Sequence, residues 1–154
     1  MEGTHGAQAQ LREVLERIAA AAGVEASVRV HAREDGLHGE YVGADLGLLI
    51  GHRGQTIDAI QHLAFRIVSR RAGQRTAVTV DAAGYRERRA ATLRATADQA
   101  AHAAVAERRP VALEAMSALE RKVIHEHLKD RRDVQTYSEG EEPARRLVVA
   151  PLVD

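Results

Sequence analysis

The stretch LLIGHRGQTIDAIQHL, residues 48–63, constrains the fold of this chain more than any other. Gly51 and Gly54 flank a histidine and an arginine there, between an apolar run and a segment whose apolar residues have helical spacing. Glycine costs about 1 kcal/mol relative to alanine inside a helix, so the pair marks a break between two helices. The first amides of the second helix lack intrahelical partners, and together with the helix dipole they favour an anion at the break.

The segments around this break predict the order helix, strand, strand, helix, helix, strand. The expected helices cover 7–22, 46–50 and a segment that begins at Gln55 or Thr56 and ends at Gly73. Alternation of apolar and polar residues predicts strands within VEASVRVHARED, LHGEYVG and RTAVTVDA.

The second half of the chain begins with a long segment that contains neither glycine nor proline. This segment predicts a helix over 85–107, about 35 Å long, that connects two domains and covers one of them. After Pro110 we expect a short strand in VALEAM, a helix over about 114–130, and strands over 133–137 and 145–150 around a polar turn.

An isolated GxxG is equally typical of a plain corner between two helices, but its context here is more specific. The helix and two strands before it, and the amphipathic helix and strand after it, resemble a type II KH domain. The resemblance implies that the GxxG loop clamps the backbone of about four unpaired nucleotides while an apolar groove receives their bases. The implied clamp and groove residues are Ile50, Gly51, His52, Arg53, Gly54, Gln55, Thr56 and Ile57. Ile60 is a further groove candidate, and a core position for at least one of these isoleucines is the alternative.

The stretch LERKVIHEHLKD carries a second informative pattern. On a helix, Arg121, His125, Lys129 and Arg132 fall within an arc of roughly 80°, with Met116, Leu119 and Val123 on the opposite side. An ordinary solvated helix face produces the same pattern. The run His-Glu-His at 125–127 does not predict a metal site, because residues one and two apart on a helix diverge.

Arg121-x-x-x-His125 followed by DVQTYSEGEEPARRLVV resembles the R-3-H domain, named for an arginine and a histidine at this spacing. The resemblance implies a surface that binds single-stranded nucleic acid. That surface combines the four residues of the helix arc with residues of the carboxy-terminal segment. Its members are Arg121, His125, Lys129, Arg132, Ser138, Gly140, Arg145 and Arg146.

A KH domain followed directly by an R-3-H domain is similar to the bacterial Jag family, also called SpoIIIJ-associated proteins or KhpB. The similarity covers about residues 7–151 and implies an α+β fold of two small domains joined by a helix, with a KH domain over 5–83 and an R-3-H domain over 84–154. Many family members carry a further amino-terminal domain, whereas this sequence begins almost at the KH helix. His52 stands where lysine or arginine is more usual in the loop.

Composition narrows the function less than the motifs do. Basic and acidic residues number 22 each, and 20 of the basic residues are arginines, a bias that both phosphate binding and a GC-rich genome produce. The few aromatic residues argue against a base-stacking platform. The absence of cysteine, of a signal peptide and of a long apolar run favours a cytoplasmic protein without membrane insertion.

We therefore expect a protein that binds single-stranded RNA, without enzymatic activity, cofactor or metal. The family resemblance implies a post-transcriptional role linked to the cell envelope or to division, and a small KH-only partner protein. A homodimer is a separate expectation. Two alternatives remain open at this point. One is a protein–protein adaptor that uses the KH fold as a docking module, and the other is an enzyme acting on phosphodiesters, against which the lack of clustered carboxylates argues.

Overall fold

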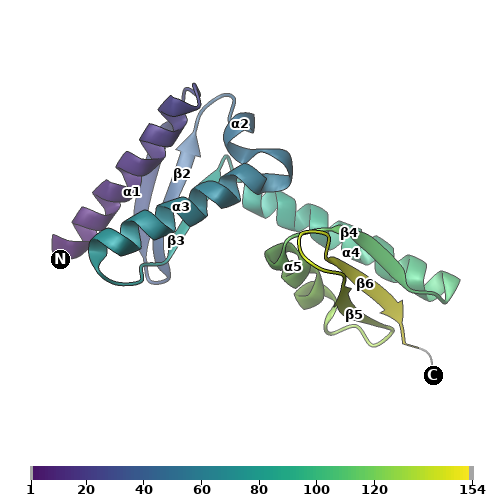
Figure 1. The fold of residues 1–154 in the computed structure, drawn as a ribbon. Coiled ribbons are helices and arrows are strands. Elements are labelled where there is room, and N and C mark those ends of the chain that lie inside the picture. The colour runs from purple at the N-terminus through teal and green to yellow at the C-terminus, as the bar shows by residue number, and fades with distance from the viewer. Residues whose placement is uncertain (1, 153–154) are drawn as a thin grey trace. The chain divides into compact units, whose positions relative to one another are not determined.

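The computed structural model describes residues 2–152, and the chain divides between Arg86 and Glu87 into two compact units. Each unit contains one three-stranded sheet together with its helices (Figure 1). The predicted α+β class is confirmed. Among the described residues, no helix is both long enough and apolar enough to cross a membrane.

The first unit follows the predicted order of elements. It consists of α1 (Glu2–Ala21), β1 (Ser27–Arg33), β2 (Gly36–Val42), α2 (Gly47–Ile50), the 3-10 turn η1 (His52–Gly54), α3 (Gln55–Ala72) and β3 (Val78–Ala82). The sheet has the strand order β1-β2-β3, in which β1 and β2 are antiparallel while β2 and β3 are parallel. Both β1 and β3 are therefore edge strands.

The core of the first unit lies between the sheet and the long helices α1 and α3 (Figure 1). Leu37, Gly39 and Tyr41 alternate on the buried face of β2, as the period of a strand requires. Gly39 lets α1 approach closely, because a β-carbon there would lie 2.5 Å from Leu15 Cδ1. The Tyr41 hydroxyl donates to the Leu15 carbonyl at 2.7 Å, and burial raises the pKa of this phenol well above its ordinary value.

The second unit is built on α4 (Tyr85–Glu107), whose first two residues belong to the first unit. It continues with β4 (Val111–Ala115), α5 (Ala118–Leu128), β5 (Val134–Glu139) and β6 (Arg146–Pro151). The sheet order is β4-β6-β5 with antiparallel pairing throughout. Buried alanines of α4 pack in one core with Ile124 and Leu128 of α5 and with Leu147 and Val149 of β6. Small side chains on α4 permit this close packing.

The prediction of a helix over 114–130 is wrong at both ends. Residues 114 and 115 belong to β4, and α5 begins only after Ser117, whose hydroxyl accepts from the Glu120 amide at 3.3 Å. Leu119, expected on the apolar side, has 66% of its surface exposed. The tertiary contacts therefore select a different face of this helix from the one that periodicity favoured.

Candidate nucleic-acid interface

The GxxG turn joins α2 to α3 through backbone conformations that few residues adopt. Gly51 has φ 75°, Arg53 has φ 50° and Gly54 has φ 76°, so three of four consecutive residues lie at positive φ. A non-glycine residue in the left-handed region costs roughly 1–2 kcal/mol. Arg53 occupies that region inside the turn, between His52 and the glycine that begins α3.

The two glycines have an internal reason to lack side chains. A β-carbon on Gly51 would lie 2.2 Å from Thr56 Oγ1, and one on Gly54 would lie 2.6 Å from Tyr85 Cε1. Real β-carbons do not approach other atoms so closely. The glycines are therefore required by the packing of the turn against Thr56 of α3 and Tyr85 of α4, in addition to the clamp that the KH resemblance implies.

The electrostatics of the turn favour an anion. His52 and Arg53 are exposed, and no side chain of the described residues caps the amino terminus of the 18-residue α3. The acidic residue in the first turn of α3, Asp58, is paired with Arg86, whose Nη1 lies 2.8 Å from Asp58 Oδ1. The carboxylate that would repel a phosphate is therefore matched by a guanidinium, while the helix dipole remains.

The apolar groove differs from the prediction. Ile57 is completely buried and Ile60 is 6% exposed, so both belong to the core of the first unit. The assignment of Ile57 to the groove was wrong: it follows the turn by three residues, where α3 faces the sheet. Ile50 is only partly buried, and Gln55 and Thr56 are exposed beside the turn.

Sequence reasoning missed the residues that adjoin the turn from β3 and α4. Arg86 donates from Nε to the Val80 carbonyl at 2.8 Å and from Nη2 to Gln61 Oε1 at 2.9 Å. The Val80 amide donates to the same Gln61 Oε1 at 2.9 Å. Tyr85 and Arg86 could have been suspected only because they follow the last strand of the first unit, since neither belongs to a recognisable motif.

In the second unit, the arginine that defines the R-3-H motif is not on the surface. Arg121 is only 7% exposed. Its guanidinium donates to the carbonyls of Met116 and Arg145 at 2.6 and 3.4 Å and to Glu142 at 2.5 Å. The prediction that Arg121 contributes to an exposed binding surface is therefore wrong, because its donors hold the segment between β5 and β6.

The predicted basic stripe is interrupted as well. His125 is exposed on α5, and its Nδ1 lies 2.5 Å from Thr136 Oγ1 on β5. Since α5 ends at Leu128, Lys129 and Arg132 lie beyond the helix. Lys129 pairs with Glu126 at 2.7 Å, whereas Arg132 is exposed and has no carboxylate partner among residues 2–152.

The remaining residues of this predicted surface flank the turn between β5 and β6. Arg146 pairs with Glu139 at 2.7 Å across the two strands. Arg145 donates to the Gly140 carbonyl at 2.7 Å and so closes the turn, in which Gly140 has φ 88°. Ser138 is partly buried on β5. Within the part of the chain that the structure describes, His125 and Arg132 are thus the two side chains of the predicted surface that are exposed without a carboxylate partner.

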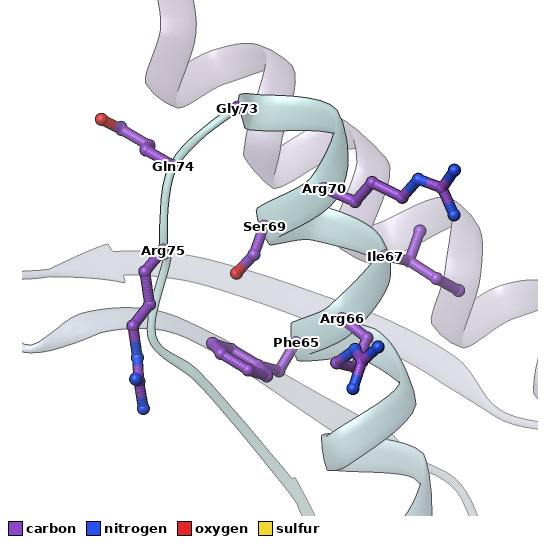
Figure 2. A pocket seen from close by; sticks show the side chains of 8 residues that line it. All are labelled: Phe65, Arg66, Ile67, Ser69, Arg70, Gly73, Gln74 and Arg75. Atoms are coloured by element: carbon purple, nitrogen blue, oxygen red, sulfur yellow. The ribbon is translucent and has the colours of Figure 1, made fainter.

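A hollow of about 620 Å³ lies at the carboxyl end of α3 (Figure 2). It is lined by Phe65, Arg66, Ile67, Ser69, Arg70, Gly73, Gln74 and Arg75. The Arg75 guanidinium lies 5.5 Å from the centroid of the Phe65 ring, a cation–π distance. Figure 2 shows Phe65 and Ser69 pointing toward the loop that carries Arg75, while Arg70 points away from it. Sequence reasoning did not single out this feature.

Across residues 2–152, no group of three or more histidine, aspartate or glutamate side chains could hold a metal ion. The chain contains no cysteine.

A sheet ordered β1-β2-β3 with a GxxG turn between α2 and α3, followed by an R-3-H unit, places the chain in the class of KH–R-3-H proteins. The family model described as the KhpA/KhpB KH domain matches residues 8–80, and that of the R-3-H domain matches residues 91–151. The chain belongs to the KhpB family.

Three relatives show the extent of this similarity, each named RNA-binding protein KhpB. The protein of Bacillus subtilis is 35% identical over 143 residues, which cover 92% of this chain and 69% of the relative. That of Clostridium symbiosum is 37% identical over 127 residues, covering 82% and 57%, respectively. That of Lactiplantibacillus plantarum is 43% identical over 104 residues, covering 68% and 32%. The chain thus spans little more than half, or less, of the latter two relatives.

Proposed function

We propose that this protein binds single-stranded RNA and that the GxxG turn of the first unit holds the RNA backbone. One observation carries the proposal: exposed His52 and Arg53 stand at the uncapped amino terminus of α3. Backbone amides, helix dipole and guanidinium there favour the same phosphate. The relatives that carry the same pair of domains are named RNA-binding proteins, which supports the choice of RNA as ligand.

The experiment that tests this proposal reverses the charge of the turn. His52→Asp with Arg53→Asp removes one fixed positive charge and adds two negative charges. A charge-assisted contact is worth roughly 1.5–3 kcal/mol, so the dissociation constant for a short single-stranded RNA should rise at least tenfold. Fluorescence anisotropy with a labelled hexanucleotide measures this change.

A matched control makes the same charge change elsewhere in the first unit. His5 and Arg17 are exposed on α1, and His5→Asp with Arg17→Asp should leave the affinity within about twofold. Unchanged affinity in a folded variant of residues 52 and 53, or an equal loss in the control, would remove the turn as the binding site.

We infer a second, weaker contact of RNA with the R-3-H unit. His125 and Arg132 support it, because both are exposed and neither has a carboxylate partner among the described residues. Arg121 supports it only indirectly, by holding the segment that leads into β6.

We further propose a cytoplasmic post-transcriptional regulator linked to the cell envelope or to division, which is the role that membership of the KhpB family suggests. Crosslinking of the protein to RNA in cells, followed by sequencing, tests this role: enrichment of transcripts for envelope or division proteins is the expected result, and a uniform sample of transcripts would contradict it. A small KH-only protein and a second copy of this chain are the proposed protein partners. Light scattering of the chain alone and mixed with such a protein tests both.

A further inference from the structure

The edge of β3 that faces away from β2 forms its hydrogen bonds with side chains of the first unit. Ala77 accepts a hydrogen bond from the Leu37 amide at 2.9 Å, so alternate residues from Ala77 onward turn their backbone toward β2. Val80 therefore turns its amide and carbonyl toward the open side. Gln61 accepts from that amide at 2.9 Å and Arg86 donates to that carbonyl at 2.8 Å.

The side chains of Gln61 and Arg86 belong to one hydrogen-bond network. Arg86 Nη2 donates to Gln61 Oε1 at 2.9 Å, and Arg86 Nη1 donates to Asp58 at 2.8 Å. Further along the strand, Asp81 Oδ1 accepts from the amides of Ala82 and Arg86 at 2.8 and 3.2 Å. Three groups thus fix the Arg86 side chain against this edge: the Asp58 and Gln61 side chains of α3 and the Val80 carbonyl of β3. Asp81 holds its backbone amide.

An open edge strand presents amides and carbonyls that can pair with another molecule. Unpaired RNA bases offer donors and acceptors side by side on their Watson–Crick edges, and proteins read them through such groups. At Val80, Gln61 supplies the acceptor and Arg86 the donor that a base would supply. The Val80 amide and carbonyl, which could otherwise distinguish bases, are therefore already hydrogen-bonded.

We propose that Gln61 and Arg86 close the β3 edge to nucleobases, so that the first unit holds RNA by its backbone with little preference for base. The inference rests on the proposed binding of RNA at the GxxG turn. The same network serves that binding, because Arg86 pairs with the Asp58 carboxylate near the turn. Arg86 is in this sense a positioning residue. It occupies the carbonyl that a base would contact, and it neutralises the carboxylate that would repel the phosphate.

The test compares the full chain with Gln61→Ala, Arg86→Ala and the double variant on hexanucleotides of adenosine, cytidine and uridine. The measured quantity is the spread, defined as the ratio of the largest to the smallest dissociation constant. Any uniform loss of affinity from an unpaired Asp58 cancels in this ratio. We expect a spread below about threefold for the unaltered chain and above about tenfold for the double variant. Arg17→Ala, which removes an exposed arginine of α1, should leave the spread unchanged.

Hydrogen exchange of the Val80 amide provides a second readout, without RNA. This amide should exchange slowly in the unaltered chain and at least tenfold faster in Gln61→Ala. In Gln61→Ala, Arg86 keeps its hydrogen bonds to Asp58 and to the Val80 carbonyl. This single variant therefore still tests the inference if the double variant fails to fold. In the double variant, bound RNA should slow the exchange again.

A spread that stays below threefold in folded variants overturns the inference, as does a spread above tenfold in the unaltered chain. Fast exchange of the Val80 amide in the unaltered chain overturns it too. These results leave the proposed function standing if binding still depends on His52 and Arg53. Loss of that dependence instead removes the proposed function, and the inference with it.

Discussion

Gly54 and Tyr85 fit together only because one of them has no side chain: a β-carbon on Gly54 would lie 2.6 Å from Tyr85 Cε1. The second glycine of the GxxG turn therefore packs against the first residue of α4. Arg86 follows directly and reaches both α3 and the edge of β3. The start of α4 is thus part of the candidate RNA site in the first unit.

Gly54→Ala should lower the free energy of unfolding by more than about 2 kcal/mol. Alanine in the left-handed region costs roughly 1–2 kcal/mol, and overpacking adds about 1–3 kcal/mol. Gly73→Ala is the matched control, because Gly73 has φ 68° but nothing within 4 Å of a β-carbon. Chemical denaturation measures both. Equal losses in the two variants would show that the Tyr85 contact does not restrict position 54.

Arg121→Ala should destabilise the second unit, because a hydrogen bond to a charged group is worth about 1.5–3 kcal/mol and the substitution removes the bonds to the Met116 and Arg145 carbonyls and to Glu142. Arg132→Ala should leave stability within about 0.5 kcal/mol and weaken the binding of long RNA. Thermal unfolding and anisotropy separate the two effects. A stable Arg121→Ala protein with lost affinity would return Arg121 to the binding surface.

Glu142 makes stability depend on pH. The hydrogen bond from Arg121, aided by its charge, holds the pKa of Glu142 below the ordinary value of 4.5. A lowered carboxyl pKa contributes stability above the unfolded value that is lost as pH falls through the folded value. The unaltered chain should therefore be more stable than Glu142→Gln at pH 7, and this difference should shrink as pH falls below about 4.5. Denaturation midpoints across pH 3–7 measure it. A constant difference would contradict the pairing.

Salt should weaken RNA binding steeply even though the chain has no net charge. Each phosphate neutralised on a single strand contributes roughly −0.7 to the slope of log K against log salt, so four to six contacts predict about −3 to −4. Reversal of the charges at His52 and Arg53 should flatten this slope. Duplex RNA should bind more weakly. A slope near zero, or a preference for duplex, would contradict a local phosphate site.

The sequence alone was sufficient for features that depend on local interactions. The glycines at 51 and 54, the apolar spacing of α3 and the alternation in β2 each restrict φ, ψ or the buried face within a few residues, and the predicted order of elements in the first unit is correct. The motif RxxxH with its distant turn similarly indicated the second unit. Such signals can be recognised in the sequence because the residues that carry them are neighbours along the chain.

Tertiary structure alone decided which of these residues face solvent. Arg121 is buried because Glu142 and the Arg145 carbonyl, more than twenty positions away, close over it. Helical periodicity places Arg121 on a face with His125 but does not determine what covers that face. The same holds for the edge of β3, where Val80 meets Gln61 and Arg86 from two different helices. Contacts between distant segments form only when the chain closes into a compact unit, so hydrogen-bonding partners of this kind have no periodic signature in the sequence.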